Sequence, residues 1–211
     1  MTSHSLPATS ARFWNLPNIL TISRILLILP FMFFMYAEFA RPESYANVWA
    51  FAIFILAAIT DWIDGVVARR WNAVTPLGML FDPLADKLLV TSALVMLAVF
   101  HAMEGGIVGA PAWIAVIIIA RELAVTGLRG MASAEGVVIS ASSGGKLKMI
   151  AQMVALGGLI LQGARVEGGR FELVGLTLDA GLVGYIALWV ALLLTLWSGL
   201  VYFYRFLGKL A

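Results

Sequence analysis

Long apolar stretches separated by short polar ones dominate the chain. Such stretches approach the ~20 residues that an α-helix needs to cross the hydrocarbon of a bilayer. They run through Ile19–Phe39, Ala46–Ala68, Leu77–Phe100, Ala112–Leu128, Met149–Gln162 and Ala180–Phe206. The fifth is short and the sixth is long, so the pattern predicts an all-α, polytopic membrane protein with about six transmembrane helices.

The residues before the first apolar stretch have a different character. Phe13 and Trp14 lie beside Arg12, which is typical of a short segment in the membrane interface. An unstructured tail is an equal alternative for the first part of this segment. Arg24 interrupts the following apolar run and no small-residue cleavage site follows, which disfavours a cleaved signal peptide. We predict an N-terminal cytoplasmic or interfacial segment at residues 1–17 and one transmembrane domain at residues 18–211.

Composition agrees with a membrane protein and charge suggests its orientation. The chain is 62% hydrophobic and 12% charged, with a mean hydropathy of +0.95. The net charge of +2 says little by itself. With a cytoplasmic N-terminus and the predicted spans, only Arg41, Arg165 and Arg170 of the 14 Lys and Arg residues fall outside. This bias predicts cytoplasmic loops that are rich in basic residues.

Several kinds of chemistry are excluded or disfavoured by what the chain lacks. It has no cysteine, which excludes disulfides, thiolate nucleophiles and cysteine-ligated metals. Its two histidines, His4 and His101, lie in the tail and at the end of a predicted span, which disfavours a histidine base or a zinc site. No basic patch supports nucleic-acid binding. Catalysis would have to use carboxylates, basic residues and a hard metal ion.

Carboxylates within an apolar region are the main candidates, because burying a charge in a bilayer is costly without a function. On helices, i, i+3, i+4 spacing places side chains on one face. One predicted stripe consists of Asp61, Asp64, Gly65, Ala68 and Arg69, and a second consists of Gly78, Asp82 and Asp86.

The two stripes would meet in an antiparallel helix pair. Thr75 and Pro76 fit the N-cap and first turn of the second helix, which places Asp64 and Asp82 at similar depths. Converging carboxylates repel unless cations neutralise them, and oxygen ligands without Cys or His suit Mg²⁺, Mn²⁺ or Ca²⁺. Small residues would leave room for a ligand, and Arg69 could contact a phosphate. The alternatives are that the small residues serve close helix packing and that the aspartates line an ion path.

The run from Asp61 to Asp86 resembles, at every fixed position, the signature of the CDP-alcohol phosphotransferase family. The resemblance implies a helical membrane enzyme, usually a homodimer, with an Mg²⁺- or Mn²⁺-dependent active site that faces the cytoplasm from the bacterial inner membrane. It implies that an alcohol attacks the lipid-bearing phosphorus of a CDP-linked donor and that CMP leaves. The implied metal ligands are Asp61, Asp64, Asp82 and Asp86, with Asp86 as the general base. The implied contacts to the CDP-linked lipid are Asp61, Gly65, Ala68, Arg69 and Gly78.

Looser motifs elsewhere bear on the acceptor alcohol. The stretches 15–24, 120–129 and 142–148 resemble the branch of the family that uses CDP-diacylglycerol and sn-glycerol 3-phosphate, although Met149 stands where many relatives have Thr. A dianionic phosphate needs several cationic donors. Candidates for a glycerol-3-phosphate pocket are Arg121, Arg129, Lys146 and Lys148. Residues that flank a span can also serve topology alone.

Polar residues in the first span offer further contacts to the CDP-diacylglycerol donor. Asn18, Thr21 and Arg24 are the candidates, and helix capping or satisfaction of backbone groups is the alternative. The signature leaves other acceptors open, namely inositol phosphate, serine or phosphatidylglycerol. A cation transporter is the rival from another class, and it is disfavoured because the aspartates all fall in the cytoplasmic half of the predicted spans.

Overall fold

A computed structural model describes most of the chain. The backbone description omits residues 1–15, 42–44, 72–75, 107–108, 135–142, 163–169, 174–175 and 211. Side chains are also outside the description at residues 16–18, 20, 61–62, 64–71, 76–84, 86, 133–134, 143–144, 170–173, 176–178 and 209–210. The interfacial segment predicted at residues 1–17 falls almost wholly outside the described residues and stays a prediction.

Helices form nearly all of the described structure. They are α1 (Leu16–Ala40), α2 (Ala46–Trp71), α3 (Pro76–Met103), α4 (Ala112–Ala134), α5 (Ser143–Gln162) and α6 (Ala180–Leu210). Each contains the apolar stretch that predicted it or nearly coincides with it, so the all-α class is confirmed. The addition is a short antiparallel hairpin of β1 (Arg170–Leu173) and β2 (Leu176–Asp179), in which Arg170 pairs with Asp179.

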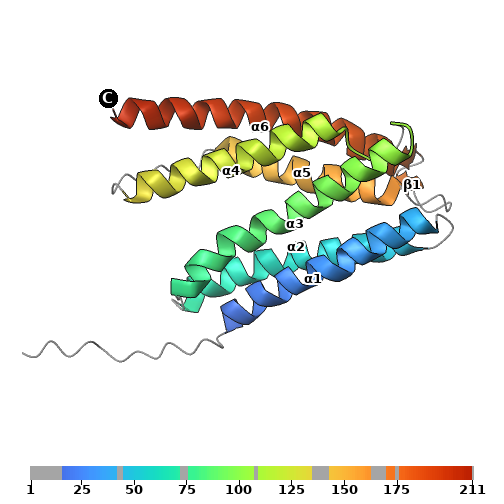
Figure 1. Cartoon of the computed structure of the whole chain (residues 1–211), viewed down its shortest axis with the longest axis horizontal. Coiled ribbons are helices and arrows are strands. Elements are labelled where there is room, and N and C mark those ends of the chain that lie inside the picture. The colour runs from blue at the N-terminus through green and yellow to red at the C-terminus, as the bar shows by residue number, and fades with distance from the viewer. Residues whose placement is uncertain are drawn as a thin grey trace, which may run out of the picture.

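The helices form two groups joined by α3. Figure 1 shows α1 beside α2 on one side, α4, α5 and α6 on the other, and α3 running obliquely between them. The end of α2, the start of α3 and the end of α6 lie towards the same end of the molecule, and the hairpin lies at the opposite end (Figure 1). In this arrangement α3 packs against both α4 and α5, and a side-chain ion pair links α4 to α5.

The core is apolar and continuous across both groups. Phe31 of α1 and Phe54 of α2 are fully buried, with ring centroids 6.2 Å apart. Leu94 of α3, Ile118 of α4 and Leu156 of α5 belong to the same cluster. Burial of large apolar side chains on these helices fixes which helix faces turn inward, and thereby positions the polar residues among them.

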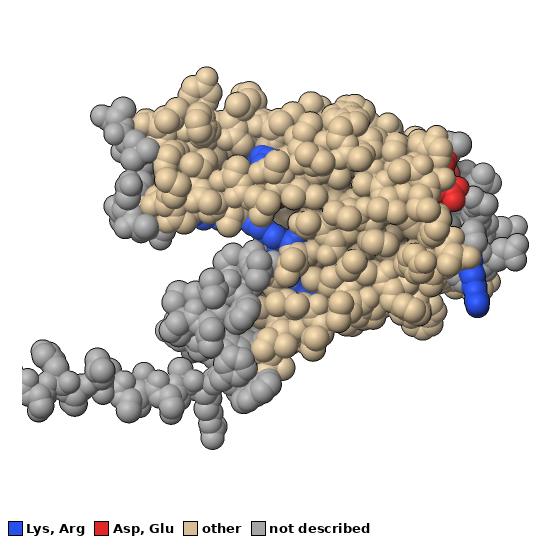
Figure 2. Space-filling model, viewed as in Figure 1, with Lys and Arg blue, Asp and Glu red and all other residues tan. Residues whose placement is uncertain are grey.

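The outer surface of the bundle is also apolar. Phe33, Leu193 and Trp197 are each about two-thirds exposed, and Figure 2 shows uncharged side chains over most of one face, with Lys and Arg gathered at a notch. Exposed apolar area on this scale suits contact with lipid rather than water. By length and composition, two described helical segments can cross a membrane, Thr21–Ala40 and Ala180–Gly208. The number of crossings stays a prediction.

Helices α5 and α6 approach each other closely at glycine. A Cβ atom on Gly158 would lie 2.7 Å from the Cα of Gly184, and one on Gly184 would lie 2.7 Å from the backbone nitrogen of Leu159. Only glycine at both positions permits this approach, as is common between membrane helices. Asp179 caps α6, because its Oδ1 accepts hydrogen bonds from the backbone nitrogens of Gly181 (2.8 Å) and Leu182 (3.2 Å).

Candidate active site

Both predicted acidic stripes lie within continuous helix. Asp61 and Asp64 are in the last part of α2, and Asp82 and Asp86 are in the first part of α3. The helix bounds therefore agree with the i, i+3 and i+4 spacing that predicted the two stripes. The side chains of these aspartates, and those of Gly65, Ala68, Arg69 and Gly78, lie outside the described residues. Thr75, the predicted cap of α3, does too, although α3 does begin at Pro76.

A hard divalent cation suits the donors that these two helices carry. Carboxylate oxygens from consecutive helices, without cysteine or histidine nearby in the sequence, are the ligands that Mg²⁺ and Mn²⁺ prefer. Among the described side chains, no three His, Asp or Glu residues come together. The signature aspartates, whose side chains lie outside the description, stay the predicted metal ligands.

Two polar residues of α1 are buried within its apolar surroundings. Thr21 and Arg24 are each 2% exposed, and their i, i+3 spacing places them on one face of the helix. The side chain of Asn18, the third predicted donor contact on this helix, lies outside the description. Burial of a guanidinium in an apolar helix is costly unless polar groups surround it, so this face of α1 is a polar site within the bundle.

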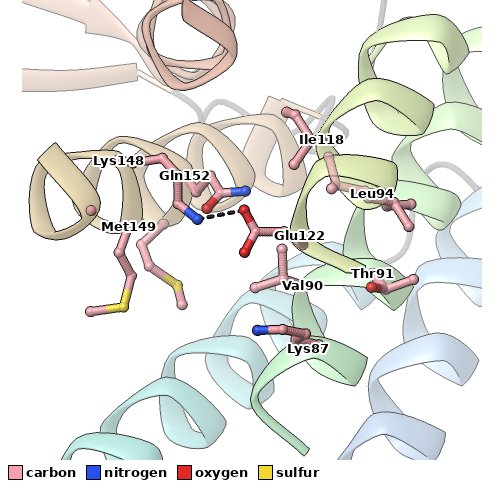
Figure 3. Close-up of a pocket in the computed structure, with 12 residues that line it drawn as sticks. Lys87, Val90, Thr91, Leu94, Ile118, Glu122, Lys148, Met149 and Gln152 are labelled. Carbon is pink, nitrogen blue, oxygen red and sulfur yellow. Dashed lines mark hydrogen bonds and ion pairs between the residues drawn. The ribbon is translucent and has the colours of Figure 1, made fainter. Parts of the chain in front are cut away.

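A cavity of about 100 Å³ lies where α3, α4 and α5 meet. Its polar wall consists of Lys87 and Thr91 from α3, Glu122 from α4, and Lys148 and Gln152 from α5 (Figure 3). Its apolar wall includes Val90, Leu94, Ile118, Ile119, Met149 and Met153. One residue of the cavity wall, Lys87, directly follows Asp86 in α3.

An ion pair joins α4 to α5 at the cavity wall. Nζ of Lys148 donates to Oε1 of Glu122 at 2.5 Å, and Nη1 of Arg121 donates to the same oxygen at 3.0 Å. Lys148 is 8% exposed and thus largely shielded from solvent. Because the Glu122 carboxylate is shared between two cations, the cluster retains a net positive charge that an anionic ligand could use.

The predicted phosphate-binding cations separate into two locations. Lys148 lines the cavity, whereas Arg121 and Arg129 contact α6. Nε of Arg121 donates to the backbone oxygen of Thr195 at 3.1 Å, and Nη2 donates to Oγ of Ser198 at 2.8 Å.

Arg129 extends the same contact between α4 and α6. Its guanidinium carbon lies 5.9 Å from the centre of the Tyr202 ring. The i, i+8 spacing of Arg121 and Arg129 thus corresponds to one face of α4, as predicted, and in this structure that face is turned towards α6. Lys146 is exposed near the start of α5, two residues before Lys148, and does not line the cavity.

Four polar cavity residues, Lys87, Thr91, Glu122 and Gln152, were not predicted from the sequence. Lys87 directly follows Asp86, Glu122 directly follows Arg121, and Gln152 follows Lys148 by one helical turn. The i, i+4 relation of Lys148 and Gln152 is a signal that could have identified Gln152. Glu122 gives a weaker signal, because only the packing of α4 on α5 reveals its contact with Lys148.

The apolar bundle and its cavity define a helical membrane protein with a cation-bearing polar site. A family model described as CDP-alcohol phosphatidyltransferase matches residues 14–197, so the chain belongs to this family. Membership confirms the resemblance drawn from the aspartate signature. The family is dependent on a divalent metal, and together with the apolar helices it gives the chain a membrane location.

Named relatives cover most of the chain. A CDP-diacylglycerol–glycerol-3-phosphate 3-phosphatidyltransferase of Bacillus subtilis is 42% identical over 198 residues, which is 90% of this chain and 94% of the relative. The protein of that name in Rickettsia typhi is 39% identical over 189 residues, or 90% of this chain and 95% of the relative. A probable phosphatidylglycerophosphate synthase of Mycobacterium tuberculosis is 43% identical over 154 residues, or 73% of this chain and 69% of the relative.

Proposed function

We propose that this protein transfers the phosphatidyl group of CDP-diacylglycerol to sn-glycerol 3-phosphate, forming phosphatidylglycerophosphate and releasing CMP. The observation that carries the proposal is the cavity lined by Lys148 of α5 and by Lys87 of α3, the helix that also bears Asp82 and Asp86. The names of the relatives from Bacillus subtilis and Rickettsia typhi, which align with 90% of this chain, support the choice of acceptor.

The proposed donor site lies between α1, α2 and α3. Asn18, Thr21 and Arg24 of α1 and Arg69 of α2 would contact the nucleotide and its diphosphate, beside small residues at Gly65, Ala68 and Gly78. Asp61, Asp64 and Asp82 would hold Mg²⁺ or Mn²⁺, with Asp86 as a further candidate ligand. When bound, such a cation neutralises the diphosphate and the charge that develops on the leaving group.

The proposed reaction is a direct displacement at phosphorus. The acceptor hydroxyl oxygen bonds to the lipid-bearing phosphorus as the bond from that phosphorus to the oxygen of CMP breaks, and CMP leaves with the electron pair. Asp86 accepts the hydroxyl proton as general base. Lys148, with Lys87, binds the acceptor phosphate by charge-assisted hydrogen bonds, and Lys146 attracts it to the site. Arg121 and Arg129 are further candidates for this phosphate from the sequence, although in this structure both contact α6.

We also propose the topology that brings these substrates together. The protein would be a multi-pass homodimer in the bacterial inner membrane, with residues 18–211 as its transmembrane domain and the active site open to the cytoplasm. Because the chain has no cysteine, single cysteines can be placed freely. At Gly208, near the C-terminus, an introduced cysteine should be protected from an impermeant maleimide in intact spheroplasts, and one at Glu104, after α3, should be labelled. The reverse pattern would refute the orientation.

The catalytic proposal is tested by following CMP release. Purified full-length protein in detergent would be given CDP-diacylglycerol, Mg²⁺ and one acceptor at a time. We expect turnover with sn-glycerol 3-phosphate and much less with serine, inositol phosphate or phosphatidylglycerol. Preferential use of one of those three would overturn the acceptor assignment and leave family membership intact.

A further inference from the structure

The cavity contains groups that a phosphate ligand does not need. Lys148 and Lys87 suit an anion, but Glu122 carries a negative charge and Gln152 carries a neutral amide. A carboxylate in a site for an anionic substrate opposes binding unless it is compensated or contacts another part of that substrate. The contacts of Glu122 and Gln152 show which part that could be.

The Glu122 carboxylate is held by one oxygen only. Oε1 accepts the hydrogen bonds from both Lys148 and Arg121. Among the described residues, no hydrogen bond reaches Oε2. In Figure 3 the second carboxylate oxygen points away from Lys148, towards the side of the cavity where Val90 and Lys87 lie. Glu122 therefore presents a fixed hydrogen-bond acceptor to the cavity.

Gln152 presents a donor to the same cavity. It is only 5% exposed, and its Nε2 has no hydrogen-bond partner among the described residues. Buried amide groups are normally paired, because an unpaired donor loses its hydrogen bonds to water without replacement. Gln152 lies one turn after Lys148 on α5 and lines the cavity together with Glu122 (Figure 3). A polar ligand in the cavity would satisfy its amide group.

We propose that Glu122 and Gln152 recognise the acceptor hydroxyl that is not consumed in the reaction, the one on the carbon next to the attacking alcohol. A hydroxyl can donate one hydrogen bond and accept others. It would donate to Oε2 of Glu122 and accept from Nε2 of Gln152, while the phosphate contacts Lys148 and Lys87. This assignment rests on the proposed function and makes the protein selective for phosphorylated vicinal diols.

Two analogues of sn-glycerol 3-phosphate separate the two contacts. Dihydroxyacetone phosphate has a ketone at the second carbon, which can accept from Gln152 but opposes the Glu122 carboxylate. The compound 3-hydroxypropyl phosphate has no oxygen there and leaves both residues unsatisfied. Both keep the phosphate and the attacking alcohol. We expect kcat/KM for each analogue to be about 10- to 150-fold below that for sn-glycerol 3-phosphate, the factor that corresponds to one hydrogen bond to a charged group.

Variants at the two residues should change selectivity in different ways. Glu122→Gln replaces a carboxylate oxygen by an amide group that can donate a hydrogen bond to the ketone. The ratio of kcat/KM for sn-glycerol 3-phosphate to kcat/KM for dihydroxyacetone phosphate should therefore fall towards one. Gln152→Met should lower kcat/KM for sn-glycerol 3-phosphate and for the ketone, but not for 3-hydroxypropyl phosphate. Gln162→Met, on the same helix outside the cavity, is the matched control and should leave all ratios as in the wild type.

The ratios of kcat/KM between the three acceptors distinguish a loss of recognition from a loss of folding. A variant that only misplaces helices would lower kcat/KM equally for all three acceptors. Equal losses in both Glu122→Gln and Gln152→Met would overturn the inference. So would wild-type protein that uses 3-hydroxypropyl phosphate as well as sn-glycerol 3-phosphate, and in that case the proposed function would stand. Wild-type protein that uses neither compound but turns over serine or inositol phosphate would overturn the proposed function and this inference together.

Discussion

The acidic stripes of α2 and α3 and the basic cluster of α4 and α5 differ in how directly the sequence indicates their chemistry. The carboxylates of the first region are spaced at i, i+3 and i+4 within single helices, so local geometry alone groups them. The cations of the second region come from separate helices, and their partners depend on packing. Lys148 pairs with Glu122, 26 residues away, and Arg121 contacts Ser198, 77 residues away. A motif thus indicates chemistry most directly where its members share a helix.

The largest expected effect lies in the acidic region. Asp86→Asn should lower kcat by ~10²–10⁴, the usual loss for a general base. Asp61→Asn, Asp64→Asn and Asp82→Asn should each weaken metal binding and nearly abolish turnover. Steady-state CMP release across a range of Mg²⁺ concentrations measures this. Glu104→Gln, after the far end of α3, is the control and should behave as wild type. Substantial activity of Asp86→Asn at saturating Mg²⁺ would remove Asp86 from the role of base.

The next largest effect is expected at Arg121. Its variants distinguish a structural contact with α6 from a role in substrate binding. Arg121→Gln removes hydrogen bonds to Thr195 and Ser198 and leaves Glu122 with Lys148 alone, so stability should fall by up to about 3–5 kcal/mol, as for a broken buried charge pair. The yield of folded protein and its midpoint temperature in detergent report this loss. We expect the KM of the folded fraction for sn-glycerol 3-phosphate to change less than in Lys148→Gln.

Arg121→Lys refines the same test, because it keeps the charge beside Glu122 but cannot reach three acceptors with one planar group. Its stability should lie between those of the wild type and Arg121→Gln. A rise in KM for the acceptor that matches the rise in Lys148→Gln, with normal stability, would instead place Arg121 in the phosphate site, as the sequence first suggested.

Lys148 should show the opposite pattern. Lys148→Gln removes a charge-assisted contact worth roughly 1.5–3 kcal/mol, so KM for sn-glycerol 3-phosphate should rise by about 10- to 150-fold, while KM for CDP-diacylglycerol changes little. Lys146→Gln removes a charge at an exposed position two residues earlier and outside the cavity, so it should raise this KM much less than Lys148→Gln does. If both variants show unaltered kinetics after normalisation for folded enzyme, these lysines serve insertion and not binding.

The sequence predicted the helical architecture well, because apolar stretches of membrane length permit few other structures. The hairpin at Arg170–Asp179 was not predicted, since its strands are short and lie in a polar loop between spans. The sequence identified the cationic residues as one set but did not separate Lys148, which lines the cavity, from the residues that contact α6. Periodicity shows that Arg121 and Arg129 share a face of α4, but it does not show which helix that face meets. Polar residues of α6, such as Ser198, carry no signal until α4 is packed beside them.

The smallest expected effect comes from Arg129, at the exposed end of the contact between α4 and α6. A cation over an aromatic ring at an exposed site contributes about 0.5–1 kcal/mol. Arg129→Gln should therefore lower the midpoint temperature slightly and leave acceptor kinetics unchanged. A double-mutant cycle with Tyr202→Leu should give a coupling energy of that size, and Tyr202→Phe, which keeps the ring, should retain the coupling. Zero coupling combined with a KM for sn-glycerol 3-phosphate raised by more than about 10-fold would move Arg129 from the helix contact to the phosphate site.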